Sequence, residues 1–131
     1  MKTLIVEDDF TSRLLLQTFL SRYGECHIAV NGLEAVEAFR IATDNGSPYG
    51  LICMDILMPE MDGKEAARQI RTLEAARGVL STYGAKIIMT TAVNNMKEVI
   101  RSFQELCDAY LCKPIDTAEL LGHLRTFRLV K

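Results

Sequence analysis

Several features that mark specialised classes of protein are missing from this sequence. Its four cysteines (Cys26, Cys53, Cys107 and Cys112) form no Cys-x-x-Cys pair, and the two histidines add no zinc-ligand spacing. No apolar run approaches the ~18 residues of a membrane span, and the first run turns acidic at Glu7, unlike a secretory signal. We therefore predict a cytoplasmic protein with reduced thiols and no membrane insertion.

An excess of charge of one sign is also missing. The chain has 15 lysine and arginine residues against 17 aspartate and glutamate residues, a net charge of −2, so the total does not favour nucleic acid as a partner. Its 131 residues, 49% of them hydrophobic, suffice for one core, and no repeat, low-complexity tract or long linker divides them. We predict one domain over residues 1–131 that binds no nucleic acid.

Short apolar runs alternate along the chain with amphipathic helical patterns. The runs are apolar throughout, as in the strands of a parallel sheet that is covered on both faces. This alternation predicts an α/β fold, with a doubly wound five-stranded parallel sheet and helices on both faces. The expected strands are residues 4–6, 26–30, 51–55, 86–90 and 109–111. Five helices are expected between and after these strands. The first has an apolar face of Leu16, Phe19, Leu20 and Tyr23 and stops at Gly24, the second follows Asn31-Gly32 with Val36 and Phe39 inward, and the third covers 63–76. The fourth has a face of Met96, Val99, Ile100 and Phe103, and the fifth has a face of Leu120, Leu121, Leu124 and Phe127.

Polar residues follow the predicted strands at their carboxyl ends, where a doubly wound sheet places its ligand site. The acidic triplet 7–9 follows the first strand, Asp55 the third, Thr90 and Thr91 the fourth, and Lys113 the fifth. Clustered carboxylates repel one another, and Mg²⁺ relieves such repulsion because it takes one or two carboxylates together with phosphate oxygens. A lysine and a hydroxyl beside the cluster would add a clamp for a phosphoryl group.

Four short motifs stand in order along the chain, each at the end of an expected strand. They are Glu7-Asp8, Asp55-x-x-Met58-Pro59-x-Met61-Asp62-Gly63, Thr91-Ala92 and Lys113-Pro114. The set resembles the receiver domains of response regulators in two-component signalling, whose stand-alone members include the chemotaxis type. The resemblance covers nearly the whole chain and implies the flavodoxin-like receiver fold.

The resemblance also implies how these residues divide the chemistry. Asp55 would be the phosphoacceptor, attacking the phosphorus of a phosphohistidine donor; covalent transfer to a carboxylate is known nucleophilic chemistry. Asp8, Asp55 and the backbone carbonyl of Leu57 would bind Mg²⁺ directly, and Glu7 would act through a bound water. In-line transfer would then need little beyond positioning and charge neutralisation.

The acidic triplet leaves two registers for the metal-binding pair. Family members often carry a basic residue five positions after the inner metal-ligating acid, and Arg13 lies five positions after Asp8. This spacing favours the pair Glu7-Asp8 over the pair Asp8-Asp9. Asp9 is then expected at the start of the first helix, where a negative charge is favourable.

A switch is a further implication of the resemblance. Thr91 and Lys113 would contact phosphoryl oxygens, and the movement of Thr91 would let Tyr110 rotate. The Lys113–Pro114 bond would be cis, which aims the lysine inward. The signalling face would comprise the fourth helix, fifth strand and fifth helix, with Lys97, Arg101, Tyr110 and Arg125 as exposed members.

Partners follow from the same resemblance. A sensor histidine kinase or a histidine phosphotransfer protein would donate the phosphoryl group. The target downstream would be an unidentified protein, since no output domain follows the last expected helix before Lys131. Leu57 and Val93 are apolar at the positions that border the path of the attacking water in the family, so we expect a long-lived phosphoryl group.

Three other functions share parts of this pattern. A phosphohydrolase with an aspartyl nucleophile needs a second acid two residues later, where this chain has Leu57. A nucleotide-binding domain needs a glycine-rich turn after the first strand, where this chain has the acidic triplet 7–9. A non-phosphorylated interaction module would lack Asp55, Lys113 or the acidic pair. We therefore predict a phosphoacceptor switch, not an enzyme with a separate substrate.

Overall fold

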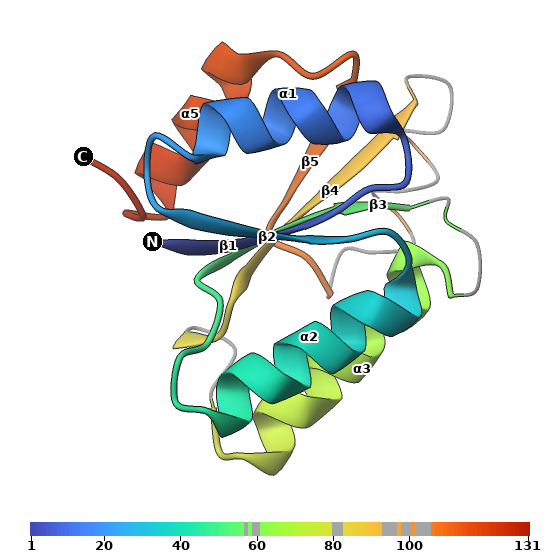
Figure 1. Cartoon of the computed structure of the whole chain (residues 1–131), viewed down its shortest axis with the longest axis vertical. Helices are drawn as coiled ribbons and strands as arrows, with labels where there is room; N and C mark the ends of the chain where they lie inside the picture. Colours follow the sequence, from blue (N-terminus) through green and yellow to red (C-terminus); the bar gives the residue numbers. More distant parts are fainter. Residues whose placement is uncertain (57, 59–60, 80–82, 93–96, 98–100, 102–105) are drawn as a thin grey trace.

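A five-stranded parallel sheet forms the centre of the molecule (Figure 1). The computed structural model describes residues 1–56, 58, 61–79, 83–92, 97, 101 and 106–131. The strand order is β2-β1-β3-β4-β5, so the direction of winding reverses between β1 and β3. The strands are β1 (Lys2–Val6), β2 (Glu25–Ala29), β3 (Leu51–Asp55), β4 (Lys86–Ala92) and β5 (Ala109–Lys113).

Helices cover both faces of the sheet, which confirms the predicted doubly wound fold. Helices α1 (Phe10–Leu20) and α5 (Thr117–Thr126) lie on one face, and α2 (Gly32–Asp44) and α3 (Gly63–Ala76) lie on the other (Figure 1). All five residues of β3 are buried, because alternate side chains enter the two cores. Among the described residues, no helix has the length and apolar character needed to cross a membrane.

Each described helix begins at a polar cap, which explains where the chain leaves a loop. In all four helices a side-chain oxygen accepts a hydrogen bond from a backbone N–H of the first turn, and such a cap contributes about 1 kcal/mol. The caps are Asp9 (to Ser12 N, 2.9 Å), Asn31 (to Glu34 N, 2.8 Å), Asp62 (to Glu65 N, 2.9 Å) and Asp116 (to Ala118 N, 2.8 Å). The prediction that Asp9 begins the first helix is therefore confirmed.

Some boundaries differ from the sequence expectation. Helix α1 ends at Leu20, where Ser21 forms its C-cap, and so stops before Gly24. Gly24 is needed for another reason: its φ is +153°, and a Cβ atom there would lie 1.7 Å from the Met1 carbonyl oxygen. Strand β4 continues two residues beyond the expected end at Thr90, so that Thr91 also lies inside it. The helix expected around residues 96–103 lies outside the described residues, apart from positions 97 and 101.

Candidate functional site

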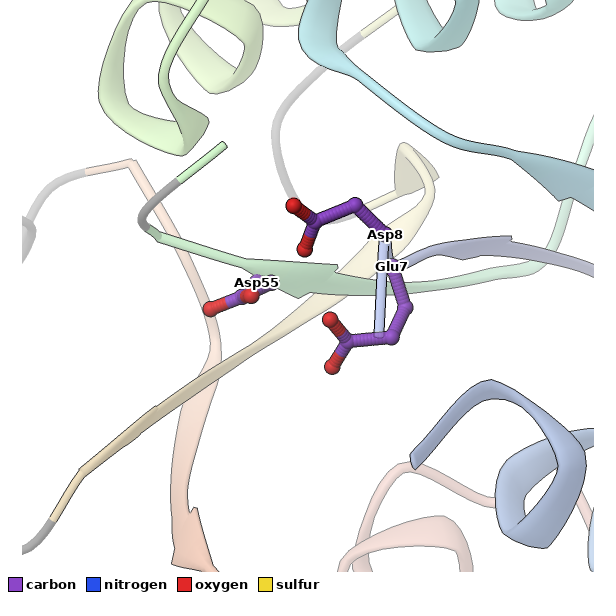
Figure 2. A group of neighbouring side chains, drawn as sticks. All are labelled: Glu7, Asp8 and Asp55. Atoms are coloured by element: carbon purple, nitrogen blue, oxygen red, sulfur yellow. The ribbon is translucent and has the colours of Figure 1, made fainter. Parts of the chain in front are cut away.

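Three carboxylates meet at the carboxyl ends of β1 and β3. The two strands are neighbours, with Val6 paired to Met54, so the residues that follow them emerge side by side. Glu7, Asp8 and Asp55 each offer one carboxylate oxygen within 4.8 Å of the others (Figure 2). The structure therefore gathers at one edge the acids that the sequence expectation placed there.

Lys113 joins this cluster from the end of β5. Its Nζ lies 2.7 Å from Glu7 Oε1 and 3.2 Å from Asp55 Oδ2. Burial opposes the charge on Lys113, but the two carboxylates outweigh it and raise the pKa of the ammonium group above its usual value. Lys113 therefore stays protonated and bridges the two acids. The Lys113–Pro114 peptide bond is cis, as expected.

Glu7 is the most enclosed member of the cluster. Its side chain is 1% exposed, and burial raises its pKa from 4.5 to about 7, with Lys113 opposing the shift and Asp55 adding to it. Its Oε2 accepts a hydrogen bond from the Asp9 N–H (3.2 Å), while Arg13 Nη1 donates to its backbone carbonyl (3.4 Å). Glu7 is thus held in place through both its carboxylate and its backbone.

The composition of the cluster suits a hard divalent cation. Three carboxylates face one ammonium group, so the fully ionised site carries excess negative charge in a largely buried setting. Oxygen ligands are those that Mg²⁺ prefers, and a divalent charge would offset the excess. Asp8 is exposed, which leaves the cluster open to solvent on one side. Asp9 is not a member, because its side chain caps α1. Of the two possible metal-binding pairs, the cluster therefore contains Glu7-Asp8 and not Asp8-Asp9.

The two other residues predicted for the switch lie on neighbouring strands. Thr91 is 3% exposed in β4, one residue beyond the partner of Asp55 in the sheet register, and it is paired with Cys112 of β5. Tyr110, in β5, is partly buried against the core on the α2 and α3 face. The backbone carbonyl of Leu57 and the side chain of Val93 lie outside the described residues.

Gly63 brings α3 directly against the end of β3. Its N–H donates to the Ile56 carbonyl (2.9 Å), and a Cβ atom there would lie 2.7 Å from the Asp55 carbonyl oxygen. The close approach of two backbones is the specific reason that only glycine fits.

An apolar surface beside the acidic cluster was not predicted from the sequence. Phe10, Leu14 and Leu15 on the outer side of α1 are 64%, 50% and 37% exposed, and we call them the α1 apolar surface. Phe10 stands two residues after Asp8. A groove of about 470 Å³ runs along the same helix and is lined by Thr11, Leu14, Leu15, Thr18, Phe19, Arg22 and Thr117. The sequence did contain a signal for this surface, because large apolar residues also occur at positions outside the inner face of the helix.

Fold and site together define a protein with an acidic, lysine-bridged centre at the carboxyl edge of a doubly wound sheet. The family model of the response regulator receiver domain matches residues 3–125, and the chain belongs to this family. It is therefore a receiver domain of two-component or phosphorelay signalling.

Curated relatives of the chain are longer proteins. Hybrid signal transduction histidine kinase B of Dictyostelium discoideum is 35% identical over 126 residues, which is 92% of this chain and 6% of the relative. Protein PetR of Rhodobacter capsulatus is 36% identical over 118 residues, 90% of this chain and 44% of the relative. The chain thus spans less than half the length of either protein.

Solved receiver domains have the same fold over nearly the whole chain. The receiver domain of the Saccharomyces cerevisiae response regulator Ssk1, solved with the histidine phosphotransfer protein Ypd1, is 30% identical with a TM-score of 0.80, covering 97% of this chain and 88% of that one. The receiver domain of the sensor histidine kinase PA1611 from Pseudomonas aeruginosa, solved with a magnesium ion in its active-site cleft, is 27% identical with a TM-score of 0.75, covering 96% and 95%.

Proposed function

We propose that Asp55 accepts a phosphoryl group from a phosphohistidine, with Mg²⁺ bound by Asp8, Asp55 and the backbone carbonyl of Leu57, and with Glu7 acting through a water. The observation that carries this proposal is the position of the Asp55 carboxylate. It lies 3.2 Å from the Lys113 ammonium and within 4.8 Å of the Glu7 and Asp8 carboxylates. A nucleophilic carboxylate beside a fixed cation and a cation-binding set is what phosphoryl transfer needs.

The chain's own residues would have distinct parts in the transfer. An Asp55 oxygen forms the new O–P bond, and the P–N bond breaks with its electron pair going to the donor imidazole. Lys113 and the Thr91 hydroxyl would each contact a phosphoryl oxygen, by charge and by hydrogen bonding respectively. Bound Mg²⁺ would neutralise the charge that the acids and the phosphoryl oxygens share.

A protein donor is favoured by the surface next to the site. The α1 apolar surface begins at Phe10, two residues after Asp8, and the groove continues along the same helix. Exposed apolar groups that adjoin a reactive centre favour a partner with a complementary apolar face. We propose that a sensor histidine kinase or a histidine phosphotransfer protein covers this surface while its phosphohistidine reaches Asp55.

The phosphorylated domain would signal by binding another protein. Charge added at Asp55 would draw Thr91 toward the phosphoryl group and vacate space into which Tyr110 would rotate, a local event that biases a two-state element. A phosphohydrolase is disfavoured because position 57 is leucine and offers no second acid for proton transfer. Incubation with generic phosphomonoesters should therefore show no steady hydrolysis.

Loading with acetyl phosphate and Mg²⁺ tests the core proposal. Intact-mass measurement should show a gain of one phosphoryl group in the wild type and none in Asp55→Asn. Asp9→Asn is the matched control: it also removes one acidic charge near the site, but asparagine caps helices as well as aspartate does, so loading should persist. Loading that survives Asp55→Asn, or that never occurs in the wild type, would refute the assignment.

A further inference from the structure

The groove along α1 follows a straight stripe of residues on one side of that helix. Thr11, Leu15, Thr18 and Arg22 line it at successive spacings of four, three and four residues, which is the repeat that brings side chains onto one face. Arg22 lies just beyond the C-cap Ser21, so the stripe runs the whole length of α1. At 1.5 Å per residue its length is about 16 Å, or about three helical turns.

A second helix is the element that fits this groove. A partner strand would need free backbone N–H and C=O groups at a sheet edge, and those of α1 are bonded within the helix. The small Thr11 and Thr18 alternate with the larger Leu15 along the stripe, which leaves room between the larger side chains for those of a partner. Apolar side chains that recur every three or four residues on an amphipathic helix match this spacing.

Arg22 supplies the charge at one end of the groove. Of the lining residues in the described part of the chain, it alone is charged. Its guanidinium Cζ lies 5.7 Å from the centroid of the Phe19 ring, and that ring contacts the ring of Tyr23. No carboxylate among the described residues forms an ion pair with Arg22. A partner that covered this cation with apolar groups alone would remove its hydration without replacing it, so this end of the groove favours a carboxylate.

The opposite end of the groove lies toward the acidic cluster. Thr11 lines that end, three residues after Asp8, whose carboxylate belongs to the cluster with Asp55. A phosphohistidine has to reach Asp55 from this end for the proposed transfer, while Arg22 lies about three turns away along α1. The groove therefore has a direction, because a donor helix that holds its phosphohistidine near one end meets an unpaired cation at the other.

We propose that the groove binds an amphipathic helix of the phosphodonor protein, and that Arg22 selects donors whose helix has an aspartate or glutamate at the end of its contact face away from the phosphohistidine. The inference rests on the proposed function, because it assigns an orientation to the donor that covers the α1 apolar surface. One ion pair at the edge of an interface should change the affinity by about threefold, and replacement of the acid by a base should change it by about tenfold.

Synthetic helical peptides test the groove without a phosphoryl group. Three peptides of equal length, blocked at both termini, carry leucines every three or four residues on one face and differ only at the end of that face, where they have glutamate, glutamine or lysine. Their dissociation constants are measured from the amide shifts of the full ¹⁵N-labelled chain, and a nitroxide at the opposite end of each peptide reports its orientation by broadening nearby amides. The variants are Arg22→Gln, Arg22→Lys and Arg125→Gln. Arg125 is the matched control because it is exposed on α5 and does not line the groove.

The wild type should bind the glutamate peptide about threefold more tightly than the glutamine peptide and about tenfold more tightly than the lysine peptide. The nitroxide should broaden the amides of Phe10 and Thr11. Arg22→Lys and Arg125→Gln should keep this order of affinities, whereas Arg22→Gln should bind the three peptides with similar affinity. Equal affinities in the wild type, an order that survives Arg22→Gln, or no shifts in α1 with any peptide would overturn the role of Arg22.

Asp55→Asn separates this inference from the proposed function. The peptides bear no phosphoryl group, so Asp55→Asn should bind them in the same order as the wild type. If acetyl phosphate does not load the wild type, the proposed function fails, and the peptide titrations still decide whether Arg22 orients an acidic helix in the groove.

Discussion

Protonation of Glu7 should control how tightly the acidic cluster binds Mg²⁺. In the metal-free protein, burial and the neighbouring Asp55 raise the pKa of Glu7 to about 7, although Lys113 opposes them. A divalent cation bound beside Glu7 favours the ionised carboxylate, so the cation and the proton compete. Lowering the pH through 7 should therefore weaken Mg²⁺ binding, in a range where ordinary carboxylates are already fully ionised.

The size of this effect follows from the pKa itself. With a pKa of about 7, the ionised fraction of Glu7 falls from about nine-tenths at pH 8 to about one-tenth at pH 6. If the ionised form is the one that accepts the cation, the apparent Kd for Mg²⁺ should rise by about tenfold across this range. The variant Glu7→Gln cannot titrate, so its weaker affinity should be nearly independent of pH between 6 and 8.

The same pKa predicts how the metal-free protein responds to pH. The folded-state pKa of Glu7, about 7, exceeds the reference value of 4.5, so protonation of Glu7 favours the folded state. That contribution is fully present below pH 4.5 and disappears as the pH rises through 7. In EDTA, the wild type should therefore lose stability toward pH 8 relative to Glu7→Gln.

Isothermal titration with Mg²⁺ at pH 6, 7 and 8, together with urea unfolding in EDTA, measures both effects. Asp9→Asn is the control, since its side chain caps α1 outside the cluster and its pKa lies below the usual value because of the hydrogen bonds from Ser12. A wild-type Kd that changes less than about twofold between pH 8 and pH 6 would refute the reasoning. An equal pH dependence in Glu7→Gln would assign the proton to another group.

Three further outcomes are expected. Leu14→Glu, within the α1 apolar surface, should slow phosphoryl transfer from a protein donor more than tenfold, by about 1.5 kcal/mol or more, without changing loading by acetyl phosphate. Ile41 on α2 is similarly exposed, and Ile41→Glu should change neither rate. Equal rates from the protein donor in the two variants would contradict the docking surface. Arg71→Met leaves the buried Glu74 carboxylate uncompensated and should lower the free energy of unfolding by about 3 kcal/mol in chemical denaturation. Arg68→Met removes an exposed ion pair and should lower it by less than about 1 kcal/mol. Similar losses in the two variants would show that the buried Arg71–Glu74 pair contributes no more than the exposed one. Thr3→Val should raise stability by about 1 kcal/mol in the same assay, because the fully buried Thr3 hydroxyl has no hydrogen-bond partner among the described residues, and a loss of stability would contradict this.

Local pattern was enough to predict the fold and the residues that gather at its edge. Apolar runs such as 51–54 must be buried on both faces, and only a parallel sheet covered by helices on both sides provides that environment. Once the strands are parallel, residues that follow them meet at one edge, so the sequence pattern alone groups Glu7, Asp55 and Lys113. Helix caps such as Asn31 are equally local, since the hydrogen bond spans three residues.

Contacts between distant segments could not be read in this way. The choice between Glu7 and Asp9 depended on which carboxylate turns toward Lys113, and the pKa of Glu7 depends on how deeply packing buries it. The backbone on both sides of Cys107 is held in place by Arg71, a residue more than thirty positions earlier in the chain. Periodicity reports the side of a helix or strand on which a residue lies. Distance, burial and charge environment arise only when several elements pack together, because each is a sum over neighbours that are remote in the chain.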